Sequence, residues 1–424
     1  MDKNKRLTVW LPVIIAASIA LGIFIGNHYL SISQGKKRSY SSGNKINAIL
    51  DIIDEQYVDT VSMSKLVEST IPKIFSELDP HSVYIPAEDA SVVNEELEGS
   101  FSGIGVSFNM QTDTILVISV ISGGPAEKAG LLPFDRIISI NDSIFSGKKK
   151  NQGEIMKTLR GAKNSTVKLG VQRGNSPELL YFDVTRGDVP VNSVDVSFEA
   201  AKGIGYIKVS KFARNTYNEF ITAIAKLKQA GCTSFVIDLR GNTGGYMAAA
   251  INMINEFRPE GRLIVYTEGK SFPRSDVYAN GTGTCKDAPI VVLTDEISAS
   301  ASEIFSGAIQ DNDRGTIIGR RTYGKGLVQT QMSLSDGSEM RLTIARYYTP
   351  SGRCIQKKYE MGNTDAYDQD IYNRYMHGEF DSADSIKMDD SLKYQTVGGR
   401  TVYGGGGIMP DIFIPRDTSG VTSY

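Results

Sequence analysis

Residues 203 to 319 alternate short apolar strands with amphipathic helices, and this order constrains the fold more than any other feature of the chain. Apolar runs typical of strands cover Ile204–Val209, Ser234–Leu239, Pro289–Leu293 and Thr316–Gly319. Helical spacing of apolar residues falls between and after them, over Asn218–Gln229, Ala248–Phe257 and Ala301–Gln310. Strands that alternate with helices predict an α/β core.

Two turns of small residues follow strands of this core, where such folds often carry function. One turn is Gly241–Gly245 and the other is Ser298–Ser302. Ser300 would stand at the start of a helix, where backbone N–H groups and the helix dipole favour an anion such as a tetrahedral oxyanion. Gly244 and Gly245 have no side chains, so a second backbone N–H can approach closely.

The chain has only three histidines in 424 residues, His28, His81 and His377. A Ser–His–Asp hydrolase needs a histidine within hydrogen-bond reach of its serine. His28 follows an apolar run near the N-terminus, and His377 lies in an acidic stretch. We expect His81, which follows a helix, to be a turn or interface residue. A lysine is therefore the expected base for a nucleophilic serine.

Lys325 is the candidate base, within Tyr323–Gln329. A lysine acts as a base only if its pKa falls from about 10.4 toward neutrality, and burial in an apolar pocket lowers it. Leu327 and Val328 can make such a pocket dry. Spacing alone would favour a surface lysine in a glycine-rich turn, and only the full set of motifs outweighs that alternative. A phosphate-binding loop is excluded, because the Gly-x-x-x-x-Gly-Lys-Ser/Thr spacing is absent.

The N-terminus predicts a membrane anchor. Lys3, Lys5 and Arg6 precede Leu7–Gly26, which carries no charge and is long enough to span a bilayer as a helix. Positive charge before the span keeps that end in the cytoplasm. A cleaved signal peptide is the alternative. After a flexible tether, two stretches with helical spacing predict a small helical hairpin that packs or dimerises.

Residues Gly99 to Gly187 carry an ordered set of motifs. The set contains Gly103-Ile104-Gly105-Val106, strands at Val117–Ile121 and Thr166–Gln172, and a helix at Gln152–Leu159. Together they resemble a PDZ domain. The resemblance implies a groove in which these glycines hold a peptide's terminal carboxylate while the adjoining strand pairs with the peptide backbone. Phe134 departs from the family, because a glycine usually precedes the aspartate there.

From about Asn44 onward, the whole chain resembles the C-terminal processing peptidases, also called tail-specific proteases. The segments that carry the resemblance, besides the PDZ set, are Leu78–Tyr84, Asp238–Gly245, Ser298–Gln310, Thr322–Gln329, Tyr348–Arg353 and Gly405–Asp411. Members are serine endopeptidases with a crotonase-like core and an embedded PDZ domain. By motif position, the resemblance implies Ser300 as nucleophile, Lys325 as general base and Gln329 as the residue that orients it.

The resemblance also implies an oxyanion hole made of the Ala301 N–H and the N–H of Gly244 or Gly245. Thr243 replaces the proline common in that turn, so which glycine donates stays open. No metal and no cofactor is implied. A non-catalytic PDZ adaptor on an inactive protease core is the alternative, and none of the three catalytic positions is lost. An acyl-CoA enzyme on the same core is a second alternative, which the outward topology disfavours.

The composition excludes several other classes. A net charge of −2 without a basic stripe gives no sign of nucleic-acid binding. Cys232, Cys285 and Cys354 are isolated, so neither a disulfide framework nor a zinc site is indicated. One pair could still form a bridge. The segment Glu360–Asp390 holds nine acidic residues and predicts a solvated surface insertion, with a lid or a partner surface as alternatives.

We therefore predict a multi-domain α/β protease with an inserted PDZ β-domain, anchored in the inner membrane of a bacterial envelope with its catalytic part outside the cytoplasm. Its partners would be protein or peptide substrates with accessible C-termini, with a homodimer as a further expectation. The predicted regions are a basic tail (1–6), anchor (7–26), tether (27–43), helical region (44–98), PDZ domain (99–187), protease core (188–356), acidic insertion (357–394) and the rest of the core (395–424).

Overall fold

The computed structural model describes residues 16–23, 42–111, 114–144, 146 and 152–417, and the chain divides into two units, 1–70 and 71–424. In the first unit, residues 16–23 are helical, and α2 (Ser42–Gln56) follows. Helix α3 (Met63–Ser76) begins there and continues into the second unit. Both predicted helices are confirmed. The predicted anchor is described only at residues 16–23, and no helix in the described ranges is long and apolar enough to cross a bilayer.

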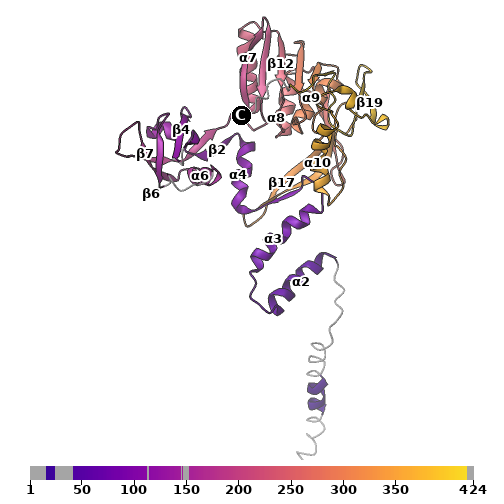
Figure 1. The fold of residues 1–424 in the computed structure, drawn as a ribbon. Coiled ribbons are helices and arrows are strands. Elements are labelled where there is room, and N and C mark those ends of the chain that lie inside the picture. Colours follow the sequence, from indigo (N-terminus) through magenta and orange to yellow (C-terminus); the bar gives the residue numbers. More distant parts are fainter. Residues whose placement is uncertain (1–15, 24–41, 112–113, 145, 147–151, 418–424) are drawn as a thin grey trace, which may run out of the picture. The chain divides into compact units, whose positions relative to one another are not determined.

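The second unit contains a six-stranded sheet, and Figure 1 shows helices packed beside it. Its strands pair in parallel except for the antiparallel pair of β10 and β11. In spatial order they are β10 (Val194–Ala201), β11 (Ile204–Val209), β12 (Ser234–Asp238), β15 (Ile290–Thr294), β16 (Thr316–Gly319) and β21 (Ile412–Phe413). The predicted α/β core is confirmed, with its strand positions within one or two residues.

Three helices connect these strands and bury their apolar faces against them. They are α7 (Thr216–Gln229), α8 (Met247–Asn255) and α9 (Ala301–Asp311). Phe257 lies at the centre of the core, with edge-to-face ring contacts to Phe220, Phe235 and Phe305 at centroid distances of 6.2, 6.3 and 6.5 Å. Such close packing makes the sheet and α9 a rigid support for the turns at their ends.

A second sheet, in which all strands pair antiparallel, carries the strand that follows the predicted lysine. The alternating pattern of the core did not predict this sheet. Its strands are β1 (Val83–Ile85), β13 (Leu263–Glu268), β14 (Ser275–Tyr278), β17 (Leu327–Ser333) and β18 (Glu339–Tyr348). Strand β17 pairs with β18, and Gln329 lies opposite Thr343.

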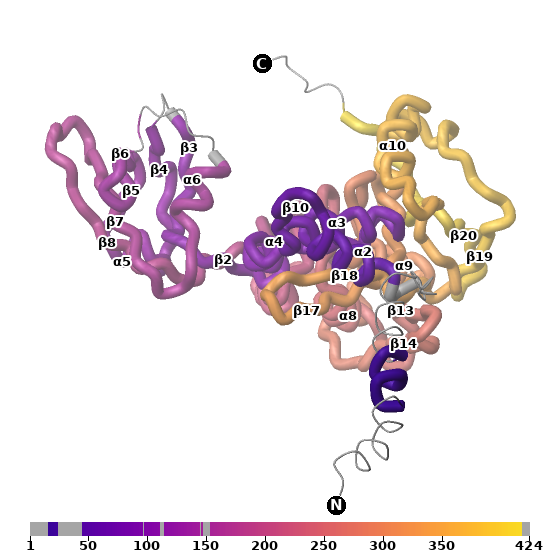
Figure 2. Tube along the Cα trace, turned by 90° about the horizontal axis from the view of Figure 1, so that it is seen from below, coloured from indigo at the N-terminus to yellow at the C-terminus, as the bar shows by residue number. Residues whose placement is uncertain are grey.

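The PDZ region is a separate antiparallel sheet with its own apolar core. Figure 2 shows its strands as one group. They are β3 (Val106–Gln111), β4 (Thr114–Val120), β5 (Arg136–Ile140), β6 (Ser143–Ile144), β7 (Thr166–Gln172) and β8 (Leu180–Thr185). Two helices accompany them, α5 (Pro125–Ala129) and α6 (Gln152–Leu159). The predicted helix Gln152–Leu159 and strand Thr166–Gln172 are confirmed with the same bounds, whereas the strand predicted at Val117–Ile121 spans Thr114–Val120.

The chain enters and leaves the PDZ region through one antiparallel pair, β2 (Ser100–Gly103) with β9 (Gly187–Pro190). This pairing makes the region an insertion between α4 (Ala87–Glu98) and the central sheet.

Phe134 occupies a turn of this region with φ of 70°. Its N–H donates to the Val117 carbonyl at 2.7 Å, and its side chain is 74% exposed. A left-handed backbone explains why glycine is usual at this position.

The acidic segment contains helix α10 (Thr364–Met376) and two short 3₁₀ turns, Ala383–Ser385 and Asp390–Leu392. Tyr367 and Arg374 of α10 are buried, so the expectation of a solvated excursion is wrong for this face of the helix. The segment ends in β19 (Lys393–Gln395), which pairs with β20 (Thr401–Tyr403).

Candidate active site

The two predicted turns meet at one edge of the central sheet. Strands β12 and β15 are adjacent and parallel, so their carboxyl ends lie side by side. The Gly241–Gly245 turn follows β12, and the Ser298–Ser302 turn follows β15. A hydrogen bond of 3.0 Å from the Ala299 N–H to the Asn242 carbonyl joins the two turns.

The three serines of the second turn have different environments. Ser298 and Ser302 are fully buried. The Ser298 hydroxyl donates to the Leu239 carbonyl and the Ser302 hydroxyl to the Asn242 carbonyl, each at 2.9 Å. Ser300 instead lines a cleft of about 740 Å³. Of the three, Ser300 is therefore the serine placed to meet a substrate.

The backbone of Ser300 has φ of 54° and ψ of −112°, at the N-terminus of α9. Non-glycine residues rarely adopt such angles, which cost on the order of 1–3 kcal/mol. Hydrogen bonds at both backbone groups of Ser300 hold this conformation. The Ser300 N–H donates to Glu303 Oε2 at 2.8 Å, and the Ser300 carbonyl accepts from the Tyr347 hydroxyl at 3.0 Å and from the Ile304 N–H at 2.9 Å.

Gly244 packs directly against the serine turn. A Cβ at Gly244 would lie 2.8 Å from the Ser300 Cβ and 3.0 Å from the Ala301 nitrogen, so only glycine fits. Its own N–H donates to Asn242 Oδ1 at 2.8 Å. Gly244 thus brings the two turns together, but its N–H is already used.

The N–H groups of Gly245 and Ala301 differ from that of Gly244. Gly245 forms a parallel bridge with Phe212, in which the flanking N–H of Tyr246 rather than that of Gly245 donates to Phe212. Within the described residues, neither the Gly245 N–H nor the Ala301 N–H has a hydrogen-bond acceptor. The choice between the two glycines, which the sequence left open, therefore favours Gly245.

Lys325 lines the same cleft from the loop between β16 and β17. Burial lowers the pKa of its ammonium, and the nearby charge of Arg341 lowers it further, whereas Glu303 and Asp79 raise it. Among the described residues, no hydrogen bond joins Ser300 Oγ to Lys325 Nζ. Catalytic hydrogen bonds are often long before substrate binds.

Glu303 connects the serine to the lysine loop, a role that we did not predict. Its buried carboxylate accepts from the Ser300 and Lys325 N–H groups at 2.8 Å each, from the Gly324 N–H at 2.7 Å and from the Thr322 hydroxyl at 2.5 Å. Burial raises its pKa, and these four donors oppose that effect. The Ser-x-x-Glu spacing of a capping box was the available sequence signal.

Gln329 also lines the cleft, but its amide nitrogen donates to the backbone carbonyl of His81. His81 lies in a turn that Asp79 closes, by accepting from the His81 N–H at 3.0 Å. The expectation that His81 is a turn residue is confirmed. Its carbonyl nevertheless holds a predicted catalytic side chain, a role that we did not anticipate.

The cleft lining combines apolar side chains with unpaired cations. Phe212, Leu327 and Tyr347 are buried at its wall. Lys211 and Arg341 also line it, and neither forms an ion pair with a described residue; Arg341 Nε donates to Gln331 Oε1 at 3.1 Å.

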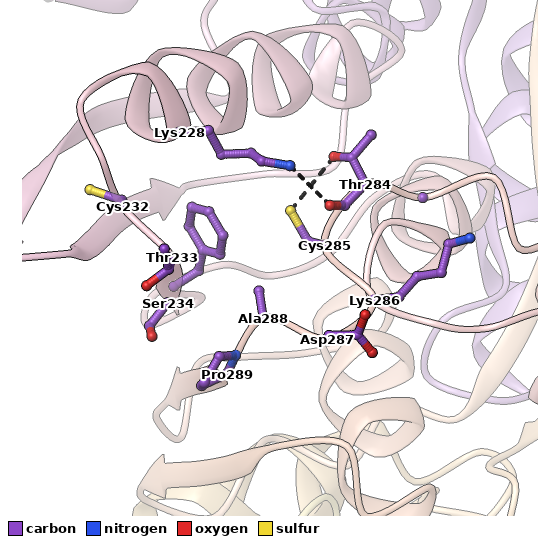
Figure 3. A pocket seen from close by; sticks show the side chains of 12 residues that line it. Lys228, Cys232, Thr233, Ser234, Thr284, Cys285, Lys286, Asp287, Ala288 and Pro289 are labelled. Atoms are coloured by element: carbon purple, nitrogen blue, oxygen red, sulfur yellow. Dashed lines mark hydrogen bonds between the residues drawn. The ribbon is translucent and has the colours of Figure 1, made fainter.

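A second cavity, of about 570 Å³, lies elsewhere on the core and is lined by Lys228, Cys232 and Cys285 among others (Figure 3). All three cysteines of the chain are free. Lys228 Nζ donates to the Thr284 carbonyl at 2.9 Å. Burial raises the pKa of both cavity thiols, which keeps them protonated and unreactive at neutral pH. This cavity lacks the nucleophile and base of the first.

The predicted carboxylate-binding loop of the PDZ region is present as a short irregular segment between β2 and β3. Gly105 has φ of 76°, and Ile104 is buried. The N–H groups of Ile104 and Gly105 have no acceptor in the part of the chain that the structure describes. Strand β3, which starts at Val106, forms one edge of its sheet. Free N–H groups beside a free strand edge are what a peptide C-terminus needs.

Comparison with known proteins gives matches over both regions. The model of peptidase family S41 matches residues 203–365, and a PDZ domain model matches residues 102–195. The carboxy-terminal processing protease CtpB of Bacillus subtilis is 35% identical over 318 residues, which cover 74% of this chain and 66% of that protein. This chain thus spans slightly less than two thirds of that relative.

Two further matches cover more of this chain. A probable CtpA-like serine protease of Staphylococcus aureus (strain N315) is 33% identical over 365 residues, covering 84% of this chain and 72% of that protein. Among solved structures, the photosystem II D1 C-terminal processing protease is 25% identical, with 90% of this chain and 96% of that chain covered and a TM-score of 0.43. From these sequence matches, the chain belongs to peptidase family S41, among the carboxy-terminal processing serine proteases that carry a PDZ domain.

Proposed function

We propose that the chain is a serine endopeptidase in which Ser300 is the nucleophile, Lys325 the general base and Gln329 the residue that orients the base. One observation carries the proposal. Ser300, Lys325 and Gln329 line a single cleft together with Gly245. Among the described residues, the N–H groups of Gly245 and of Ala301, the residue after the serine, have no acceptor.

The chemistry follows from this arrangement. Ser300 Oγ attacks the scissile carbonyl and gives its proton to the neutral amine of Lys325. The Ala301 and Gly245 N–H groups donate to the oxyanion that forms. Lys325 then protonates the leaving amine as the C–N bond breaks, which leaves an acyl-enzyme on Ser300. A water molecule, deprotonated by Lys325, hydrolyses this ester and regenerates the serine.

The PDZ region would select the substrate. We infer that Gly103, Ile104, Gly105 and Val106 hold the terminal carboxylate of a protein tail, which pairs with the edge of β3. The free N–H groups of Ile104 and Gly105 support this role. Substrates would then be proteins with accessible C-termini.

Single substitutions test the catalytic proposal. Ser300→Ala and Lys325→Ala should each lower cleavage of an unstructured C-terminal peptide to background, with unchanged melting temperatures. The exposed residues Ser275 and Lys270 supply matched controls, Ser275→Ala and Lys270→Ala, which should cleave at the parental rate. Full activity of either cleft variant would contradict the proposed roles. An inactive parental protein that still binds tails would instead support the PDZ adaptor.

The location, the domain boundaries and the crotonase-like character of the core stay predictions. We propose an envelope protease anchored near its N-terminus, on the basis of the uncharged stretch Leu7–Gly26. Fractionation of cells that produce the full chain, with protease added from outside the inner membrane, tests this. Recovery of the protein in the cytoplasm would contradict it.

A further inference from the structure

Helix α10 presents one face to the core. Tyr367 and Arg374, seven residues apart and therefore on the same side of the helix, are 3% and 5% exposed. Tyr372 is 55% exposed. An acidic helix that buries a tyrosine and an arginine has specific partners for their polar atoms, and those partners identify what the helix does.

Arg374 holds the backbone that leads to the catalytic lysine. Its guanidinium donates to the Thr322 carbonyl at 3.0 Å and to the Arg321 carbonyl at 2.8 Å. Thr322 in turn donates its hydroxyl to Glu303, whose carboxylate also holds the Lys325 N–H. Arg374 therefore acts on the start of the lysine loop.

Tyr367 contacts His81, which lies outside the lysine loop. Its hydroxyl lies 2.9 Å from His81 Nε2, and its ring meets the His81 ring edge-on at a centroid distance of 5.2 Å. Because Gln356 Nε2 donates to the tyrosine hydroxyl at 3.3 Å, that hydroxyl is free to donate its proton to His81. Burial lowers the pKa of His81 to about 4, so its ring is neutral at pH 7 and can accept.

His81 transmits this contact to the active site. Its carbonyl accepts from Gln329 Nε2, the side chain proposed to orient Lys325. Tyr367 thus contacts the residue that holds Gln329, without touching the cleft itself.

Lys357 contacts both helix α10 and the lysine loop. Its ammonium lies 4.1 Å from the centroid of Tyr323 and 4.0 Å from that of Tyr367, and it donates to the Tyr367 carbonyl at 3.1 Å. Its N–H donates to the Gly324 carbonyl at 2.9 Å. A cation between two aromatic rings out of water is a strong contact.

We propose that α10 is a positioning element for the catalytic lysine, in which Tyr367 acts on Gln329 through His81 and Arg374 acts on the backbone before Lys325. The inference rests on the proposed function of Ser300 and Lys325. It assigns to the acidic segment a role in aligning the base.

Tyr367→Phe tests this directly, because it removes one hydroxyl and keeps the buried ring. The full chain carrying Tyr367→Phe should lose roughly 10- to 100-fold in kcat, with KM within about twofold, since misplacement of a base affects the transition state more than substrate binding. The rate at which a fluorophosphonate labels Ser300 should fall in parallel. Tyr372→Phe, on the exposed side of the same helix, should match the parental protein.

A merely structural role would lower the melting temperature of Tyr367→Phe and leave its kcat unchanged at a temperature where it is folded. That result would overturn the proposal. Ser300→Ala in the same assay separates this inference from the proposed function. Residual cleavage by Ser300→Ala contradicts the nucleophile, whereas an inactive Ser300→Ala beside a fully active Tyr367→Phe contradicts only the role of α10.

Substitutions of Arg374 provide a second test of the proposal. Arg374→Lys keeps the charge next to Glu379, to which Arg374 Nε lies 3.5 Å away, but offers fewer donors for two carbonyls. We expect an intermediate loss of kcat for Arg374→Lys and a larger loss for Arg374→Met. Equal kcat in both variants and the parental protein would contradict this contact.

Discussion

At the scale of single residues, the backbone of Ser300 connects sequence to function. A φ of 54° with ψ of −112° is unfavourable for any residue with a Cβ, yet it directs the side chain of Ser300 into the cleft while Ser298 and Ser302 bond inward. Packing of Gly244 against Ser300 and the bond from Ser300 to Glu303 hold this conformation. The strain is therefore a property of the position rather than of the serine hydroxyl.

This strain predicts that Ser300→Gly is more stable than Ser300→Ala by about 1 kcal/mol, because glycine tolerates positive φ and alanine does not. Thermal unfolding of the core measures the difference, and both variants should be inactive. Ser306 in the middle of α9 is the matched control, since glycine there should be less stable than alanine by about 1 kcal/mol. The same sign at both positions would contradict the strain.

The protonation of Lys325 gives a second prediction at this scale. In the proposed mechanism Lys325 acts in its neutral form, so kcat/KM should fall as pH drops through its lowered pKa. The charge of Arg341 contributes to that lowering. Arg341→Met should therefore raise the pKa of Lys325 and move the acid limb of the pH profile to higher pH.

Arg346→Met is the control for this shift, because Arg346 lies on the same strand, β18, and is exposed. It should leave the acid limb in place. The midpoint of the limb, rather than its height, is the measurement, since Arg341 also lines the cleft and can affect substrate binding. An unchanged midpoint in Arg341→Met would contradict the electrostatic coupling.

At the scale of elements, Glu303 joins α9 to the lysine loop. The Glu303 carboxylate accepts hydrogen bonds from four donors. Glutamine would place its NH₂ group against two of these donors, which would then lose their acceptor. We expect Glu303→Gln to cost about 1–3 kcal/mol of stability per unsatisfied group and to lower kcat by roughly 100-fold.

Asp311→Asn separates the two effects. Asp311 is buried at the opposite end of α9 in an ion pair with Arg353 at 2.7 Å, so its loss should destabilise the core and leave kcat unchanged well below the unfolding temperature. Equal kcat in the two variants under these conditions would show that Glu303 stabilises the fold and does not contribute to catalysis.

The sequence predicted some elements and missed others, for physical reasons. Apolar periodicity located α7, α9 and the buried strands, because burial against one core imposes a regular pattern. Strands β17 and β18 were missed since they are half-buried and carry little regular pattern. The contacts of Tyr367 and Arg374 could not be predicted, because their partners include backbone carbonyls and a distant histidine, which leave no signature in residue type or spacing.

At the scale of the whole molecule, the insertion of the PDZ region through one pair of strands separates tail recognition from chemistry. Strand β2 ends at Gly103, directly opposite Gly187, where β9 begins. The central sheet and its turns lie outside the insertion in sequence, so substrate selection can depend on the PDZ region while the acyl-enzyme step does not.

This separation predicts how the enzyme responds to a blocked tail. A substrate with an amidated C-terminus lacks the carboxylate that the Ile104 and Gly105 N–H groups would bind, so KM should rise roughly tenfold, which corresponds to one lost charge-assisted contact, while kcat stays constant. A variant in which Asn-Gly replaces residues 104–186 joins Gly103 to Gly187 through a favoured hairpin turn. In this variant, substrates with a free C-terminal carboxylate and with a C-terminal amide should react equally. An unchanged KM for the amide in the full chain would contradict carboxylate capture, and continued discrimination by the shortened chain would place tail recognition in the cleft that holds Lys211 and Arg341.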